Sequence, residues 1–285
     1  MKKKWVIAIS VIVLLIVILV ILSFTVFSLK RVEIDYRTST KNLIATDEEI
    51  IESGQFKYGS SVFFHGKNNY IEKIEAAYPY IKVINIETVF PSKFVIHVAE
   101  RLETYAIEHK GQIYICDDQY KVLRITDNFI SDQTNAILLE GLKIEDKNYA
   151  IGEFMETKGA FPIYDALFEN NITQNEQISL IESMEYFVFH DENINENLVS
   201  VKLNFFNGQT YLIYNVSYGL VYKVELMLDV FSQIYTYIGK TIEFDEQEIT
   251  LTEQNLRNAT IEINNYYDYR VYDEEDCYFK IIPSL

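Results

Sequence analysis

The chain has 285 residues, of which 42 are acidic and 25 are Lys or Arg, so its formal net charge is −17. This acidic balance favours solubility and argues against binding of nucleic acid or of anionic lipid along most of the chain. None of the four histidines has a Cys, an Asp or another His at metal-ligand spacing, and the sequence has no motif for a catalytic nucleophile, a zinc protease or a phosphate-binding loop. We therefore expect a protein that is not an enzyme and that uses no cofactor, metal or small-molecule substrate.

The N-terminal segment is the most informative part of the sequence. Three lysines at positions 2–4 precede an unbroken apolar run of 23 residues, Trp5–Phe27. As a helix with a rise of about 1.5 Å per residue, this run would reach roughly 34 Å, which is enough to cross a hydrocarbon core. The run is too long for a cleaved signal peptide, and it has no polar stripe of the kind that a buried helix of this length would show. The sequence therefore predicts a transmembrane signal anchor over residues 5–27.

The charges around this run predict the orientation of the chain. Residues 1–4 carry three lysines and are expected to form a short cytoplasmic tail, in keeping with the positive-inside rule. All 42 acidic residues and 22 of the 25 basic ones follow Phe27. We expect a single-pass protein of the cell membrane, with a cytoplasmic N-terminus and an extracellular C-terminal domain.

Residues 31–102 begin with the pattern of a strand followed by two helices. Val32–Tyr36 alternates with a period of two residues, as a half-buried strand does. Thr46 with Glu49 forms a capping box, which opens a short helix that ends near Gly54. A second helix is expected over residues 68–78, because its apolar residues recur at helical spacing and Pro79 follows it.

A hairpin completes this segment. Ile84, Ile86 and Phe90 are expected on one face of its first strand, and Pro91–Ser92 supplies the turn. On the second strand, three apolar residues alternate with His97, which is expected to face solvent rather than to bind a metal; they are Phe94, Ile96 and Val98. Residues 31–102 thus predict a β-α-α-β-β module in which two helices cover one face of a three-stranded sheet.

Several short motifs in and after this module resemble a known family. Tyr78–Ile81 precedes a strand that ends in Val89–Ser92, and Phe94–Val98 is followed by Glu100-Arg101. After an anchor, this order resembles the POTRA domain of the FtsQ/DivIB cell-division proteins. Two later segments, Gly111–Asp117 and Ile137–Gly141, resemble the next motifs of that family. The chain departs from the family at Tyr120, where the family has a hairpin glycine, so we expect that turn to differ.

The resemblance implies a function. Members of this family are non-enzymatic scaffolds of the cell-division machinery that act at the septum. It implies bitopic coiled-coil partners outside the membrane, one FtsL-like and one FtsB/DivIC-like, and a part in the control of septal wall synthesis. Partner binding would proceed by strand addition to a sheet edge. The alternative is a membrane-tethered hydrolase of the cell envelope, with its catalytic residues in the second domain.

The second domain is expected over residues 103–265, as a mixed α/β fold dominated by an antiparallel sheet. Its clearest elements are a helix over 157–170, a hairpin over 199–214 and a helix over 220–238. The hairpin contains Asn207-Gly208, which favours a type I′ turn. The whole chain is therefore assigned to the α+β class, and residues 266–285 are assigned to a C-terminal tail.

The partner-binding site is expected at a late strand of this domain. Residues 259–264 read as a terminal strand, which would have one neighbour and a free edge. Tyrosines just beyond it offer contact area, although they could instead cover the core of the sheet itself. The candidate residues are Ala259, Ile261, Ile263, Tyr266, Tyr267 and Tyr269. The two cysteines, Cys116 and Cys277, are consistent either with two free thiols or with a disulfide.

Overall fold

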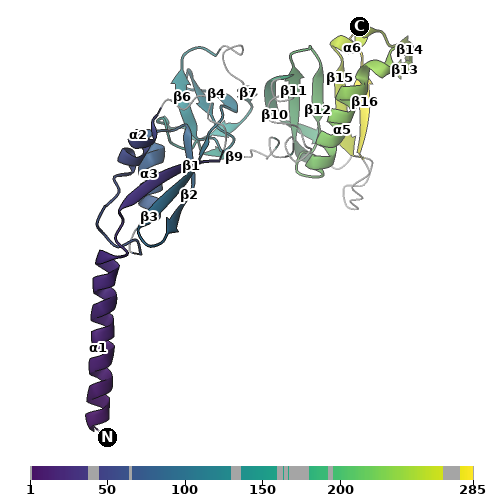
Figure 1. The fold of residues 1–285 in the computed structure, drawn as a ribbon. Helices are drawn as coiled ribbons and strands as arrows, with labels where there is room; N and C mark the ends of the chain where they lie inside the picture. Colours follow the sequence, from purple (N-terminus) through teal and green to yellow (C-terminus); the bar gives the residue numbers. More distant parts are fainter. Residues whose placement is uncertain are drawn as a thin grey trace. The chain divides into compact units, whose positions relative to one another are not determined.

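The chain forms two compact units, Met1–Leu102 and Glu103–Leu285, in a computed structural model (Figure 1). Both units combine helices with sheets, which places the chain in the α+β class. The structure describes residues 2–37, 45–63, 66–129, 136–158, 163, 166, 180–191, 195–265 and 277–284.

The first unit opens with helix α1, Lys2–Thr25. Side chains of α1 are described for Trp5 and from Ile9 onward, and the large apolar ones among them are exposed. Over the part of the chain that the structure describes, no helix is both long enough and apolar enough to cross a membrane.

The rest of the first unit has the expected β-α-α-β-β order. Its elements are β1 (Arg31–Tyr36), α2 (Asp47–Gly54), α3 (Lys67–Ala77), β2 (Ile81–Val89) and β3 (Lys93–Glu100). The sheet order is β1-β3-β2, with β1 parallel and β2 antiparallel to the central strand β3. The predicted capping box starts α2: the Thr46 hydroxyl accepts from the Glu49 amide, and the Glu49 carboxylate accepts from the Thr46 amide.

One core holds this unit together. Phe94, Ile96 and Val98 of the central strand are fully buried, as their alternation predicted. They belong to one apolar cluster with Ile50 of α2 and Ile74 of α3, which are also fully buried. The helices therefore cover the face of the sheet to which these alternating side chains point.

The prediction for the first hairpin strand was wrong at two of its three residues. Ile86 is buried, but Ile84 is 51% exposed and Phe90 is 60% exposed. The cause at Ile84 is a bulge between Val83 and Asn85, where the pairing with β3 shifts by one residue. An extra residue reverses the alternation of a strand, so Val83 rather than Ile84 reaches the core.

The expectation that His97 faces solvent was also wrong, because its side chain is buried on the sheet. Its Nδ1 lies 2.7 Å from Asp35 Oδ2 on β1, and its Nε2 lies 3.1 Å from Glu87 Oε2 on β2. Arg37 also lies against the ring, with its Nη2 2.8 Å from Nδ1. The histidine thus links the two outer strands through a polar cluster.

The second unit is built on a nine-stranded mixed sheet. Its strands are β4 (Tyr105–His109), β5 (Gln112–Cys116), β6 (Val122–Thr126), β7 (Ile137–Glu140), β10 (Ile181–Asp191), β11 (Glu196–Phe205), β12 (Thr210–Ile213), β15 (Thr260–Asn265) and β16 (Cys277–Ile282). The order is β16-β15-β12-β11-β10-β7-β4-β5-β6. Five neighbouring pairs are antiparallel and three are parallel, so antiparallel pairing dominates as expected.

Smaller elements complete the second unit. Two short hairpins pair β8 (Lys143–Ile144) with β9 (Thr157–Lys158), and β13 (Thr241–Phe244) with β14 (Gln247–Thr250). The expected helix over 220–238 is α5 (Leu220–Gln233), followed by the 3-10 helix η3 (Ile234–Tyr237), and α6 (Glu253–Arg257) comes later. The helix expected over 157–170 begins instead with β9 and otherwise falls mostly outside the described residues, although Ile163 and Ala166 are helical.

Two turns differ from the sequence-based expectation. Asn207 is not among the residues with positive φ, so the turn after β11 is not type I′; Gly208 alone takes the left-handed conformation there, with φ of 91°. Tyr120 was expected to force a different turn because the family has glycine there, but it adopts a positive φ of 63° itself. Its ring stacks on that of Tyr105, with the ring centroids 5.2 Å apart.

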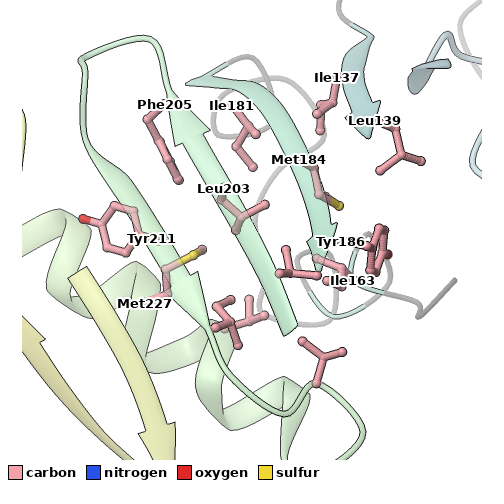
Figure 2. Close-up of a cluster of buried hydrophobic side chains, with 14 of the residues drawn as sticks. Ile137, Leu139, Ile163, Ile181, Met184, Tyr186, Leu203, Phe205, Tyr211 and Met227 are labelled. Atoms are coloured by element: carbon pink, nitrogen blue, oxygen red, sulfur yellow. The ribbon is translucent and has the colours of Figure 1, made fainter. Parts of the chain in front are cut away.

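The core of the second unit lies between the sheet and α5. Figure 2 shows buried side chains of β7, β10, β11 and β12 gathered with Met227 of α5. Gly141, just after β7, has a φ of +76°, and a Cβ atom there would collide with the carbonyl oxygen of Tyr186. This close approach explains why a glycine ends the Ile137–Gly141 segment.

Cys116, in the same core, is a free and buried thiol. Its Sγ lies 3.6 Å from Met155 Sδ. Burial, together with the charge of Asp117, raises the pKa of the Cys116 thiol above its ordinary value. The side chain of Cys277 lies outside the described residues.

The first unit allows a direct test of the core assignment. Phe94→Ala or Ile96→Ala should lower the free energy of unfolding by about 2–5 kcal/mol, because each removes a fully buried side chain. Urea unfolding of residues 28–285 measures this loss, with Ile84→Ala as the matched control on an exposed position of the same sheet. Equal losses for Ile84→Ala and Ile96→Ala would contradict the bulge at Val83.

A free strand edge as the candidate binding site

The strand predicted to be terminal is an internal strand of the sheet. β15 pairs in parallel with β12 on one side and antiparallel with β16 on the other. The prediction that residues 259–264 have a free edge was therefore wrong, and so was the assignment of all of residues 266–285 to a tail. The cause is non-local: β16 follows after a segment of 11 residues and adds itself to the edge that β15 would otherwise expose.

Three of the six candidate binding residues are buried in the core, and the other three lie outside the described residues. Ala259, Ile261 and Ile263 are fully buried and belong to the core of the second unit. Substitution at Ile261 would damage that core, so it is unsuited to test an interface. Tyr266, Tyr267 and Tyr269 lie outside the described residues.

The free edge belongs to β16, whose hydrogen-bonded neighbour among the described strands is β15 alone (Figure 1). The direction of its backbone groups follows from β15. Ala259 and Ile263 accept from the amides of Thr210 and Tyr214 at 3.0 Å, so the odd-numbered residues of β15 face β12. Because backbone direction alternates along a strand, Glu262 faces β16 and pairs with Lys280. The N–H and C=O groups of Phe279 and Ile281 therefore point away from the sheet.

Side chains hold this edge strand in place. Ile281 is buried in the core, and the ring of Phe279 packs edge-on against Tyr237 of η3 at 5.9 Å. After the strand, the Ser284 amide donates to Asn255 O at 3.1 Å, and Asn255 Nδ2 donates back to Ser284 O at 2.9 Å. The edge is thus a fixed template and not a frayed terminus.

The opposite edge of the sheet is better covered. On β6, the Val122 amide donates to Glu153 O at 2.8 Å, and the Gly152 amide donates to Val122 O at 2.7 Å. Arg124 of β6 forms a two-point ion pair with Glu103, at 2.6 and 3.1 Å. An approaching strand would have to displace these contacts, so β16 is the more accessible template.

A buried lysine of α5 forms hydrogen bonds to the backbone just after β12. Lys223 of α5 is fully buried, and its Nζ donates to the carbonyl oxygens of Tyr214 and Asn215 at 2.8 Å each. These carbonyls lie just past the end of β12. The lysine therefore ties α5 to the sheet, a structural role. Among the residues that the structure describes, no three His, Cys, Asp or Glu side chains come together as a metal site.

The sequence did carry a signal for β16. Phe279 and Ile281 alternate with Lys280, and Pro283 follows, which is the pattern of a short strand that ends at a proline. A period-two pattern of only six residues is weak unless its partner strand is known.

The family model described as "POTRA domain, FtsQ-type" matches residues 27–101, which hold the β-α-α-β-β module. These residues therefore form a POTRA domain of the FtsQ type.

Two relatives extend the similarity beyond this domain. The cell division protein DivIB of Clostridium tetani is 33% identical over 165 residues, which is 57% of this chain and 54% of that protein. The cell division protein DivIB of Clostridium acetobutylicum is 31% identical over 119 residues, 42% of this chain and 46% of that protein. The chain thus spans about half the length of the curated relatives it matches. The resemblance seen in the sequence is confirmed: the chain carries an FtsQ-type POTRA domain and is similar to two DivIB cell division proteins.

Proline substitutions test the direction of the β16 backbone. Lys280→Pro removes an amide that faces β15, so it should lower the free energy of unfolding by about 1–3 kcal/mol relative to Lys280→Ala. Phe279→Pro removes an amide that points outward and should match Phe279→Ala within experimental error. Urea unfolding of residues 28–285 measures all four variants. A larger loss of stability for Phe279→Pro than for Lys280→Pro, each relative to its alanine variant, would show that the amide of Phe279 faces β15 and not outward.

Proposed function

We propose that this protein is a non-enzymatic, membrane-anchored scaffold of the bacterial cell-division machinery. It would link bitopic coiled-coil proteins, one FtsL-like and one FtsB/DivIC-like, outside the membrane at the septum, and would help to control septal wall synthesis. The observation that carries the proposal is the FtsQ-type POTRA domain joined to a second unit in which β16 is an edge strand of the described sheet. Similarity to two cell division proteins supports it.

The anchor is proposed from the composition of the N-terminal segment. Trp5–Phe27 contains no charged residue, and three lysines stand before it. In the structure, the described apolar side chains from Ile9 to Phe24 are turned outward from α1. Exposing so many apolar groups to water is unfavourable, whereas a bilayer would accept them. We place residues 1–4 in the cytoplasm and the chain after the anchor outside the cell.

The domain division follows from this proposal. Residues 31–102 would be the POTRA domain and would follow the anchor directly in the chain. The second domain would start at residue 103 and, with β16 included, would extend to the end of the described chain instead of stopping at 265.

The partner surface is proposed at the edge of β16. Phe279 and Ile281 direct backbone donors and acceptors outward, and an extended partner segment could pair with them as an added strand. Tyr266, Tyr267 and Tyr269 remain candidates for partner contact, because the segment between β15 and β16 contains them.

Matched variants at one position test this surface. Phe279→Pro should abolish capture of a partner from detergent-solubilised membranes, since it removes the outward amide. Phe279→Ala keeps that amide and should retain most of the binding. Far-ultraviolet circular dichroism confirms that both remain folded. Full capture by the proline variant would exclude the edge as the interface, and hydrolysis of purified cell wall by residues 28–285 would contradict the non-enzymatic assignment.

A further inference from the structure

The end of α1 and two loops of the POTRA domain are joined by backbone hydrogen bonds. The Leu29 amide donates to Ser60 O at 2.8 Å, and the Gly59 amide donates to Leu29 O at 2.9 Å. The Val62 amide donates to Phe27 O at 2.8 Å. The Lys30 amide donates to Ser92 O, in the turn of the β2–β3 hairpin, at 2.8 Å. The segment between helix and domain is therefore held in place and is not a free tether.

The helix itself takes part in this connection. Ser23, in the last turn of α1, lies with its Oγ 2.7 Å from Ser61 Oγ. Ser61 is buried, as are Ser28 and Leu29 of the connecting segment. Because buried polar groups are costly to separate from their partners, the domain is expected to keep its position on the end of the helix.

Three phenyl rings gather at this junction, one from each of the joined segments. The ring centroids of Phe27 and Phe63 are 5.4 Å apart, those of Phe63 and Phe90 are 5.6 Å apart, and those of Phe27 and Phe90 are 6.2 Å apart. Phe63 is 54% exposed and Phe90 is 60% exposed. We call these three residues the phenylalanine foot.

The foot is unusual for a surface facing water. Its two loop members come from tight turns, where polar residues are the rule, and neither ring is needed for the buried core that holds the domain. Tyr58, in the loop that pairs with Leu29, is also 54% exposed. Tyrosine and tryptophan are enriched where a protein crosses from hydrocarbon to headgroups, and Tyr58 is such a residue. The exposed phenyl rings have no polar group, so transfer from water to hydrocarbon is favourable for them.

The position of the foot along the chain identifies what covers it. Phe27 is the last residue of the apolar run, and Lys30 follows within three residues. If the run crosses a bilayer, its end and the rings that touch it must lie at the level of the headgroups. We propose that the phenylalanine foot inserts into the membrane–water interface on the extracellular side of the cell membrane. The POTRA domain would then contact the lipid surface directly and in a fixed orientation. This inference rests on the proposed membrane anchor.

Tryptophan fluorescence in lipid vesicles tests the foot and the anchor separately. The full chain contains one tryptophan, Trp5, at the start of the apolar run. The protein is reconstituted into vesicles of equal parts phosphatidylglycerol and phosphatidylcholine, with a spin label carried on the lipid chain either near the headgroup or near the bilayer centre. Phe63→Trp, Phe90→Trp and Ile84→Trp are each made in a Trp5→Phe background. Ile84 is a matched control, because it is as exposed as Phe63 but lies on strand β2, away from the foot.

The proposal expects a clear pattern of quenching. Phe63→Trp and Phe90→Trp should lose emission to the shallow label more than to the deep one and should shift to shorter wavelength, whereas Ile84→Trp should show neither change. Quenched Trp5 with unquenched Phe63→Trp and Phe90→Trp would overturn the foot and leave the anchor standing. Equal quenching of Ile84→Trp would overturn the foot as a specific contact. Unquenched Trp5 in the unsubstituted protein would overturn the anchor and the foot together.

Discussion

Leu29 is the residue through which the N-terminal helix and the POTRA domain are joined. Its amide and its carbonyl both pair with the loop at residues 59–60, and its side chain is 1% exposed in the core of the first unit. The chain leaves this residue directly into β1, and the next amide, that of Lys30, pairs with the hairpin turn. The helix, both loops and the first strand therefore converge on one segment.

A second constraint shapes the other unit. The nine-stranded sheet has two edge strands, and each edge strand has backbone N–H and C=O groups that pair with no other described strand. Such groups are either covered by other parts of the chain or available to pair with another chain. At one edge, the segment around Gly152 and Glu153 covers β6. At the other, β16 completes the core with Ile281 and at the same time turns a row of backbone groups outward. The strand that would bind a partner is thus also part of the folded core. Because this strand is already ordered, binding would cost little conformational entropy on this side of the interface.

The sequence predicted the elements whose signals are local. The capping box at Thr46 and the alternation of Phe94, Ile96 and Val98 involve neighbours within a few residues, and the structure confirms them. The expectations for Ile84 and His97 failed for a different reason. The alternation of residues along one strand does not reveal a bulge, such as the one between Val83 and Asn85. It also does not show that carboxylates from the two neighbouring strands lie against His97.

The position of the candidate edge strand was predicted only in part, for the same physical reason. Residues 259–264 do form a strand near the edge of the sheet, but whether a strand is the edge depends on what the rest of the chain adds to it. β16 pairs with β15 across a segment of 11 residues, and its pattern is too short to be decisive by itself. Tyr120 shows a related limit: sequence rules favour glycine at positive φ, but here a tyrosine whose ring stacks on Tyr105 takes that conformation.

Localisation in living cells tests the central claim, that this protein is a membrane-anchored component of the division machinery. A fluorescent protein fused to the N-terminus would be imaged in dividing cells, in the unsubstituted protein and in the folded Phe279→Pro variant. The account predicts a membrane signal concentrated at midcell for the unsubstituted protein and a loss of that concentration, with the membrane signal retained, for the variant. A uniform membrane signal for the unsubstituted protein would contradict it.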